Sequence, residues 1–225
     1  SIGDVGCFSF DYVKTITCGE GGAMITNNDK FALHADHYSD HGHDHVGNDR
    51  GAESHPFIGY NFRISELNAA VGLAQVRRID DFIAMQRKNK KVLKDALATI
   101  PEVSFRRIPD EAGDSATFLS FFMSTAELTN KVVAAFKEFG VDAYWNYYEN
   151  SWHYIKKWDH LKDMKTLFPV SDQIKKGMQD LNTTTFPQSD DVISRNISCL
   201  IKLSWTDAEV QDRAEKMVAA IQSVL

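Results

Sequence analysis

The sequence predicts an α/β protein of two parts that meet near residue 100. Strand-like runs alternate with amphipathic helical patterns after that point, which is typical of a small α/β domain. A change in composition and Pro101, which stops a long helical pattern, mark the boundary. The 225 residues, 43% of them apolar and 25% charged, are enough to bury the core of one or two globular domains.

The composition argues against several classes of protein. The 25 Lys and Arg against 31 Asp and Glu give a formal net charge of −6, whereas nucleic-acid-binding domains usually carry a basic face. No apolar run approaches the roughly 20 residues that a membrane-spanning helix needs. Cys7, Cys18 and Cys199 form no CxxC pair, which argues against a disulfide scaffold or a zinc ribbon. We therefore expect a reducing, cytoplasmic environment.

The first part combines strand patterns, a glycine-rich turn and helices with recognisable starts. Asn28, Ser65 and their neighbours are typical helix caps, and small residues on one face favour close packing of the helix after Ser65. The expected elements are a buried strand at 5–10, β-rich runs at 15–18 and 23–26 around the turn Gly19–Gly22, a helix at 30–39, a long loop at 40–60, a helix from Ser65 and a helix at 80–99. Loops as long as 40–60 often carry function.

The second part has fewer but regular signals. The expected elements are a strand at 117–123, a helix at 127–139 ended by Gly140, an aromatic tract at 144–158, a strand at 196–203 and a last amphipathic helix capped by Thr206.

Lys14 is the most informative single residue. It follows the first strand among aromatic residues and precedes the glycine-rich turn. A lysine that loses solvation there favours its neutral amine, a nucleophile that can form a Schiff base with an aldehyde. Ser9, five residues earlier, can donate a hydrogen bond to a phosphate oxygen. The alternative is a solvated lysine at a strand end and a serine paired with backbone.

The stretch FSFDYVKTITCGEGGAMIT, followed later by IGYNFRISELNAAVGLAQVRRID, resembles the sugar aminotransferase family of the DegT/StrS type. The strand, the lysine, the Gly-Glu-Gly-Gly turn and the Gly-x-Asn-x-Arg segment occur in the family's order. The resemblance implies the fold of type I pyridoxal-phosphate-dependent transferases. Residues 1–100 would then form the C-terminal part of the cofactor-binding large domain, and 101–225 the small α/β domain.

The resemblance also implies roles for individual residues. Lys14 corresponds to the lysine that holds pyridoxal 5′-phosphate and then moves the proton as general base and acid. Ser9 corresponds to a phosphate-binding residue, and Asn61 to one that reaches the phosphate in the neighbouring subunit. A homodimer with shared active sites follows. The phosphate-cradling turn, the aspartate for the pyridinium nitrogen and the stacking ring would lie in an N-terminal half before residue 1, which the complete enzyme needs.

The implied reaction moves an amino group from an amino acid, by resemblance glutamate, to a keto sugar for cell-surface polysaccharide. The aromatic tract is similar to a branch that aminates the 8-keto position of a 3-deoxy-octulosonate, since the usual Tyr-x-Pro-Leu-His run is absent. Arg63, Tyr147, His153 and Arg195 are the candidate substrate residues, and ion pairs or core packing are the alternatives for them. The alternative function is a relative without transaminase activity, either a sugar dehydratase or a non-catalytic protein.

A segment rich in histidine and aspartate spans residues 34–45. Its members are His34, His37, His41, His43 and His45, interleaved with Asp36, Asp40 and Asp44. These residue types suggest a metal site, but glycines interrupt the segment and it lies in the expected loop. A polar substrate loop or dimer-interface loop is the favoured interpretation, and we predict no metal.

Overall fold

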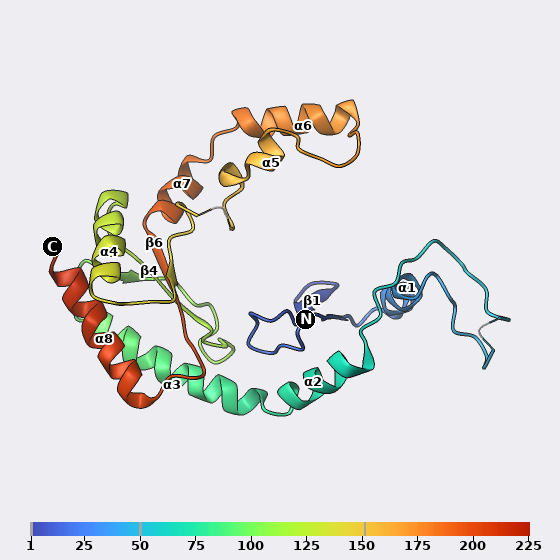
Figure 1. Cartoon of the computed structure of the whole chain (residues 1–225), viewed down its shortest axis with the longest axis horizontal. Helices are drawn as coiled ribbons and strands as arrows, with labels where there is room; N and C mark the ends of the chain where they lie inside the picture. The colour runs from blue at the N-terminus through green and yellow to red at the C-terminus, as the bar shows by residue number, and fades with distance from the viewer. Residues whose placement is uncertain (1, 50, 151) are drawn as a thin grey trace. The chain divides into compact units, whose positions relative to one another are not determined.

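The computed structural model describes residues 2–49, 51–150 and 152–225 (Figure 1). The chain divides into two compact units, one ending at Phe82 and the other running from Ile83 to Leu225. The division falls inside helix α3 (Ile79–Leu97), and the functional domains expected to meet near residue 100 stay a prediction. Arg50 in the expected loop and Ser151 in the aromatic tract lie outside the described residues.

The first unit opens with an antiparallel hairpin of β1 (Gly6–Ser9) and β2 (Gly22–Ile25). The expected burial of this strand is wrong, because β1 is half-buried at Gly6 and exposed from Cys7 to Ser9, with Phe8 53% exposed. The expected β-rich run at 15–18 is a bend followed by irregular backbone instead. The reason is local, since the N–H of Cys18 donates to the Phe10 carbonyl at 3.0 Å and closes a loop there.

Two predicted helices follow with their predicted caps. In α1 (Asp29–Ser39) the side chain of Asn28 accepts hydrogen bonds from the first-turn N–H groups, and in α2 (Glu66–Val76) Ser65 does the same. The long loop between them is also confirmed. Its two ends pair through an antiparallel bridge between Asp40 and Asn61.

The second unit is built on a four-stranded antiparallel sheet in the order β3-β4-β6-β5. The strands are β3 (Ser104–Phe105), β4 (Phe118–Phe122), β5 (Tyr144–Trp145) and β6 (Asn196–Leu200). Leu119 pairs with Cys199 and Phe121 with Ile197, so that alternate residues of β4 face the core. β6 ends at Leu200, short of the expected 203.

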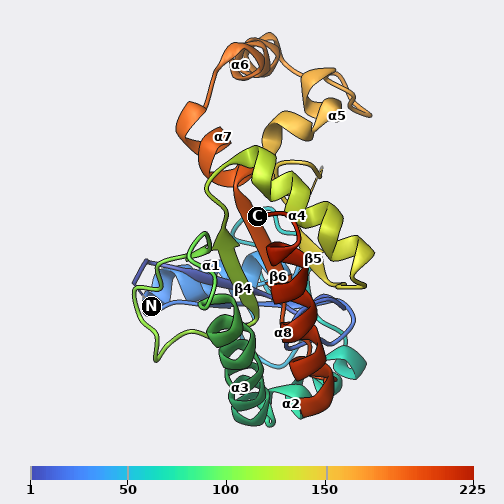
Figure 2. The same ribbon diagram turned by 90° about the vertical axis from the view of Figure 1, so that its left-hand side faces the viewer.

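Helices α4 (Ala126–Glu138) and α8 (Asp207–Gln222) lie side by side on one face of this sheet (Figure 2). Their apolar faces bury Phe136 and Met217 completely, together with Leu93 and Leu97 from α3. The predicted Thr206 cap is a full capping box with Glu209. Strands and helices thus alternate along this unit, and its correspondence to the expected small domain stays a prediction.

The sequence did not predict the helices between β5 and β6. They are η1 (Ile155–Lys157), α5 (Asp159–Lys162), α6 (Asp172–Thr183) and α7 (Pro187–Ser194). None of these helices contains a buried residue among those described, although the η1 cap Tyr154 is buried. α6 does carry an apolar stripe, Ile174, Met178 and Leu181 at helical spacing, which the sequence interpretation overlooked. No helix in the described part of the chain combines the length and apolar character needed to cross a membrane.

Candidate active site

Lys14 lies in the turn that follows β1, with Ser9 at the end of the strand. The backbone N–H of Lys14 donates to the Asp11 carbonyl at 3.1 Å, and its Nζ lies 3.5 Å from Asp11 Oδ2. Asp11 Oδ1 accepts the Val13 N–H at 2.8 Å, and Ser9 Oγ accepts the Asp11 N–H at 3.4 Å. Asp11 therefore contacts both predicted groups, the amine of Lys14 through its carboxylate and the hydroxyl of Ser9 through its backbone N–H.

The expected desolvation of Lys14 is wrong for this chain. Its side chain is 45% exposed, and that of Asp11 is 30% exposed. The reason is the uncovered hairpin, which leaves the amine in contact with solvent beside a carboxylate. Asp11 was missed by the sequence interpretation, although its position three residues before Lys14 across a turn was a usable signal. The amine is accessible to a reagent, and any loss of its water depends on what binds over the hairpin.

The glycines of the predicted turn are needed for close packing. A Cβ on Gly22 would lie 2.8 Å from the Phe8 carbonyl oxygen, and one on Gly21 would lie 2.7 Å from Cys18 Sγ. The turn also binds the start of α2, because Asn68 Nδ2 donates to the Glu20 carbonyl at 2.8 Å. The strand–turn motif and the Asn61–Arg63 segment that precedes α2 are therefore connected within one unit.

Asn61 and Arg63 lie together as the motif predicted. Asn61 Oδ1 accepts a hydrogen bond from Arg63 Nε at 3.1 Å, and Arg63 Nη1 lies 3.1 Å from Asp40 Oδ1. Arg63 also lines an open cavity of about 990 Å³, together with Gly21, Gly22 and the start of α2. Lys14 and Ser9 are not among the lining residues of that cavity. The guanidinium is 43% exposed and can meet an anion from the cavity side.

Tyr147, His153 and Arg195 belong to the second unit. The rings of Tyr147 and His153 meet edge-on at 5.0 Å, and Trp152 stacks on His153 at 4.9 Å. Burial raises the pKa of Tyr147 above its usual value. Arg195 is held by Asp191, with Nη2–Oδ2 at 2.7 Å and Nε–Oδ1 at 3.2 Å, an ion pair that raises the pKa of Arg195. Tyr147 and His153 are thus brought together, and the substrate role of all three residues stays a prediction.

A second polar pair in this unit was not predicted. Tyr154, 6% exposed, donates a hydrogen bond to Asp190, and Lys156 Nζ lies 3.5 Å from the same carboxylate. Burial, followed by the neighbouring Asp190, raises the pKa of Tyr154. Asp190 is 36 residues away in the chain, so nothing in the sequence indicated this contact.

The histidine-rich segment begins on helix α1 and continues into the loop after it. The helix ends at Ser39, so His37 lies on α1 and is buried, while His41 and His43 lie beyond it in the loop. Asp40, His41 and His43 offer ligand atoms within 4.8 Å of one another. The sequence-based prediction of no metal did not anticipate this grouping.

The sequence of this chain matches a known protein family. Residues 1–216 match the DegT/DnrJ/EryC1/StrS aminotransferase family. The L-glutamine:2-deoxy-scyllo-inosose aminotransferase of Streptoalloteichus tenebrarius is 34% identical over 134 residues, covering 57% of this chain and 30% of that protein. The GDP-perosamine synthase of Vibrio cholerae is 28% identical over 213 residues, covering 89% of this chain and 53% of that protein.

Solved structures support the fold. An aminotransferase from Psychrobacter cryohalolentis matches with a TM-score of 0.78 at 19% identity, over 99% of this chain and 57% of that one. The PLP form of the putative sugar aminotransferase Spr1654 from Streptococcus pneumoniae matches with a TM-score of 0.69 at 17% identity, over 100% of this chain and 53% of that one. These matches confirm the predicted α/β fold of type I transferases. The chain spans about half the length of these structures, and 30% and 53% of the two curated relatives.

Proposed function

Because this chain belongs to the DegT/DnrJ/EryC1/StrS aminotransferase family, we propose that it forms part of a pyridoxal-phosphate-dependent enzyme that moves an amino group from an amino acid to a keto sugar. The observation that carries the proposal is Lys14, an accessible amine in the turn after β1, standing in the family's motif order before the Gly-Glu-Gly-Gly turn. The proposal concerns the complete enzyme, since the chain covers about half of its relatives' length.

The residues of the first unit fit a ligand with an aldehyde and a phosphate. Lys14 offers the amine that forms a covalent linkage, and Ser9 offers a hydroxyl donor five residues earlier. The amide of Asn61 is oriented by Arg63, which leaves its NH₂ group as a donor for a phosphate oxygen, in our proposal that of the neighbouring subunit. Pyridoxal phosphate, when bound, supplies the electron sink for the chemistry.

Lys14 has the second role of moving the proton once its amine is released. Among the described residues its side chain has the one exposed contact with Asp11 at 3.5 Å, so the amine has the freedom to swing between the linkage and a proton-transfer position. In our proposal Asp11 accepts the ammonium form in the released state. The histidine that would replace this lysine in dehydratase relatives is absent from position 14, which favours amino transfer.

The substrate assignment follows from charge and ring chemistry. Arg63 at the edge of the 990 Å³ cavity suits an anionic group such as a sugar phosphate or carboxylate. The rings of Tyr147 and His153 suit the apolar face of a sugar, and Arg195 would act once it is released from Asp191. We propose a nucleotide-linked keto sugar or an 8-keto-3-deoxy-octulosonate as the acceptor, used for cell-surface polysaccharide. Two relatives whose names specify sugar or cyclitol amination support this class.

We further propose a homodimer that shares its active sites, and a cytoplasmic location. Glutamate is the proposed donor, and glutamine is the donor named for one relative, so both are tested together.

The test is the first half of the reaction. The complete holoenzyme is mixed with glutamate or glutamine, and its visible absorbance is followed for conversion of the cofactor from its aldehyde to its amine form. We expect conversion with one donor, its loss in Lys14→Ala, and its retention in Lys30→Ala, which alters another exposed lysine, in the first turn of α1. No conversion with either donor would contradict transamination and favour the dehydratase or non-catalytic alternative.

A further inference from the structure

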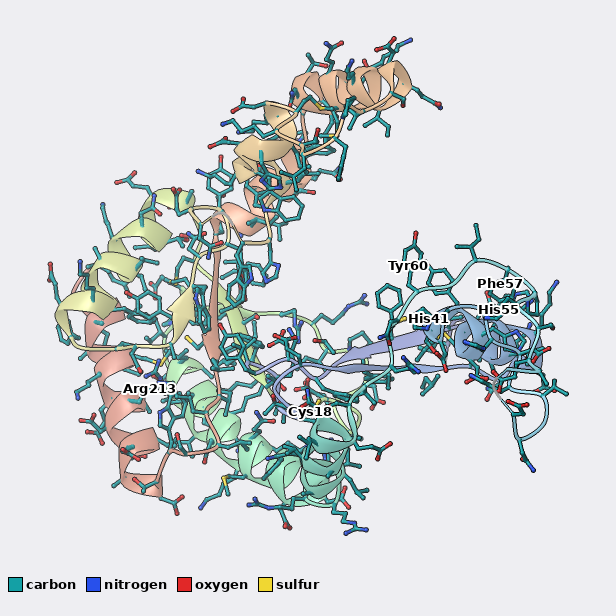
Figure 3. All side chains as sticks on the ribbon, turned by 45° about the vertical axis from the view of Figure 1, so that its right-hand side comes forward. Cys18, His41, His55, Phe57, Tyr60 and Arg213 are labelled. Carbon is teal, nitrogen blue, oxygen red and sulfur yellow. The ribbon has the colours of Figure 1, made fainter. Side chains whose placement is uncertain are left out.

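The base of the 40–60 loop brings several metal-ligand side chains close together. The N–H of His41 donates to the Tyr60 carbonyl at 2.9 Å, directly beside the Asp40–Asn61 bridge. A Cβ on Gly42 would lie 2.0 Å from the Phe57 carbonyl oxygen, so the two arms of the loop are in backbone contact. Figure 3 shows His41, His55, Phe57 and Tyr60 gathered beside α1. The backbone that carries the side chains of Asp40, His41 and His43 is therefore fixed by contacts between the two arms of the loop.

Three of these side chains have metal-ligand spacing. One atom each of Asp40, His41 and His43 lies within 4.8 Å of the other two, and His41 Nδ1 lies 3.1 Å from Asp40 Oδ1. Donors at about 2.0–2.2 Å from a tetrahedral Zn²⁺ are about 3.3–3.5 Å from one another. The Asp40–His41 spacing is close to that value, and the His43 donor lies within 4.8 Å of both. Asp40 is only 10% exposed, so water competes weakly for it.

Buried and poorly satisfied polar atoms surround this group. His43 Nδ1 lies 2.8 Å from Glu53 Oε2, with side-chain exposures of 16% and 7%. Within the described residues neither atom has a well-aligned hydrogen bond, and the same is true of both ring nitrogens of His37, which is 5% exposed. His37 lies against the segment, with its ring 6.3 Å from that of His45. Buried polar groups are normally satisfied, so the facing atoms of His43 and Glu53 favour a further partner at this group.

Glu53 stands where a metal-binding histidine usually has its carboxylate partner. A ligating imidazole commonly donates its second ring N–H to a carboxylate, which fixes the tautomer and the ring orientation. A proton on His43 Nδ1, facing Glu53, leaves Nε2 as the lone-pair donor toward the metal. His43 Nδ1 and Glu53 Oε2 lie at hydrogen-bonding distance, and we expect metal binding to align them in this way.

Arg63 and His45 both contact the carboxylate of Asp40. Arg63 Nη1 lies 3.1 Å from Oδ1, and His45 Nε2 lies 3.1 Å from Oδ2 while its Nδ1 contacts Asp36 at 2.7 Å. Metal binding must displace one of them from Asp40. If His45 leaves Asp40, it keeps its contact with Asp36. If Arg63 leaves Asp40, it keeps its hydrogen bond to Asn61 and faces the open cavity. Either side chain therefore keeps a partner.

We propose that Asp40, His41 and His43 bind a divalent transition metal of the Zn²⁺ class, with Glu53 orienting His43. Two imidazoles and one carboxylate suit Zn²⁺ or Co²⁺, and they do not suit Mg²⁺ or Ca²⁺, which prefer oxygen ligands alone. The metal would close the base of the loop whose far arm carries Asn61 and Arg63. The site is independent of the covalent chemistry at Lys14.

The test uses the complete holoenzyme, stripped with a chelator and titrated with Co²⁺ and, by calorimetry, with Zn²⁺. We expect saturable binding of one metal per chain, with Co²⁺ absorption bands of a four- or five-coordinate site. Glu53→Gln should weaken binding about 10- to 100-fold, and His43→Asn and Asp40→Asn should weaken it more, because only in Glu53→Gln do all the ligands remain. His160→Asn, an exposed histidine on α5, is the matched control and should bind like the native protein.

Two results would overturn the proposal. One is the absence of saturable Co²⁺ or Zn²⁺ binding, which would leave the segment as a set of ion pairs between histidines and carboxylates. The other is unchanged affinity and unchanged Co²⁺ bands in His43→Asn, which would place the metal elsewhere, for example on the cofactor phosphate. Circular dichroism establishes that each variant is folded. Glu53→Gln, which removes no ligand, carries the test if Asp40→Asn does not fold.

Discussion

The contact between Lys14 and Asp11 yields a prediction whose size follows from the structure. When Lys14 forms a neutral imine with an aldehyde, water and the ammonium proton are released, and the ion pair with Asp11 is then lost. At 3.5 Å two unit charges in water attract by about 1.2 kcal/mol. Because the side chains are 45% and 30% exposed, about 0.2–1 kcal/mol remains after screening and side-chain entropy. Removing the carboxylate charge should therefore favour attachment by about 1.4- to 5-fold.

Asp11→Asn and Asp11→Ala separate the charge from the turn. The asparagine retains an oxygen that can accept the Val13 N–H at the position of Oδ1, whereas alanine loses this bond, worth about 0.5–1.5 kcal/mol. We expect pyridoxal phosphate to bind the Asn variant of the apoenzyme tighter than the native apoenzyme by about 1.4- to 5-fold. The Ala variant should lose part or all of this gain, because the turn is less ordered.

The assay is a titration of apoenzyme with pyridoxal phosphate, followed by the absorbance of the lysine linkage at low and high salt. The advantage of Asp11→Asn should shrink at high salt, since exposed ion pairs are screened. A tenfold or larger loss of affinity in Asp11→Asn would refute the reasoning. Asp11 would then contribute to binding in a way that a counter-charge for Lys14 does not explain.

Two further predictions concern the second unit. Phe136→Ala should lower the free energy of unfolding by about 3–5 kcal/mol in urea denaturation, because the ring is fully buried and packs at 5.2 Å against Tyr144; a loss below about 1 kcal/mol would contradict that packing. Lys202, and after it Arg213, lower the pKa of Asp142, so the stability that this carboxylate contributes is present above its unfolded pKa of about 3.9 and lost as pH falls through the lower folded value. The stability difference between the native protein and Asp142→Asn should therefore shrink below about pH 4 in thermal melts, and a difference that persists to pH 2 would contradict the assignment.

Local signals in the sequence predicted most of the regular elements. The caps at Asn28, Ser65 and Thr206 fix helix starts because each side chain satisfies first-turn N–H groups of its own helix. β4 was predicted by its apolar run, which the sheet buries on alternate residues. These features depend only on neighbours in the chain, so a single sequence contains them.

Contacts between distant residues could not be predicted in the same way. The apolar character of 5–10 indicated burial, but burial needs a covering element, and the described chain provides none over β1. Glu53 contacts His43, and Asp190 contacts Tyr154, through the way in which the 40–60 loop and the segment between β5 and β6 fold back. The spacing of apolar residues in the sequence does not predict such contacts. Within the candidate site, the sequence predicted the neighbourhood of Asn61 and Arg63 through the family motif, and it missed Asp11 and the Asp40 contact with Arg63.

The most direct test of the proposed function is to trap the bond at Lys14. Holoenzyme is reduced with borohydride, digested and analysed by mass spectrometry for a phosphopyridoxyl group. The account predicts one modified lysine, Lys14, within the peptide that contains FSFDYVK, and no modification in Lys14→Ala. A label on another lysine of the native protein, or none at all, would contradict it.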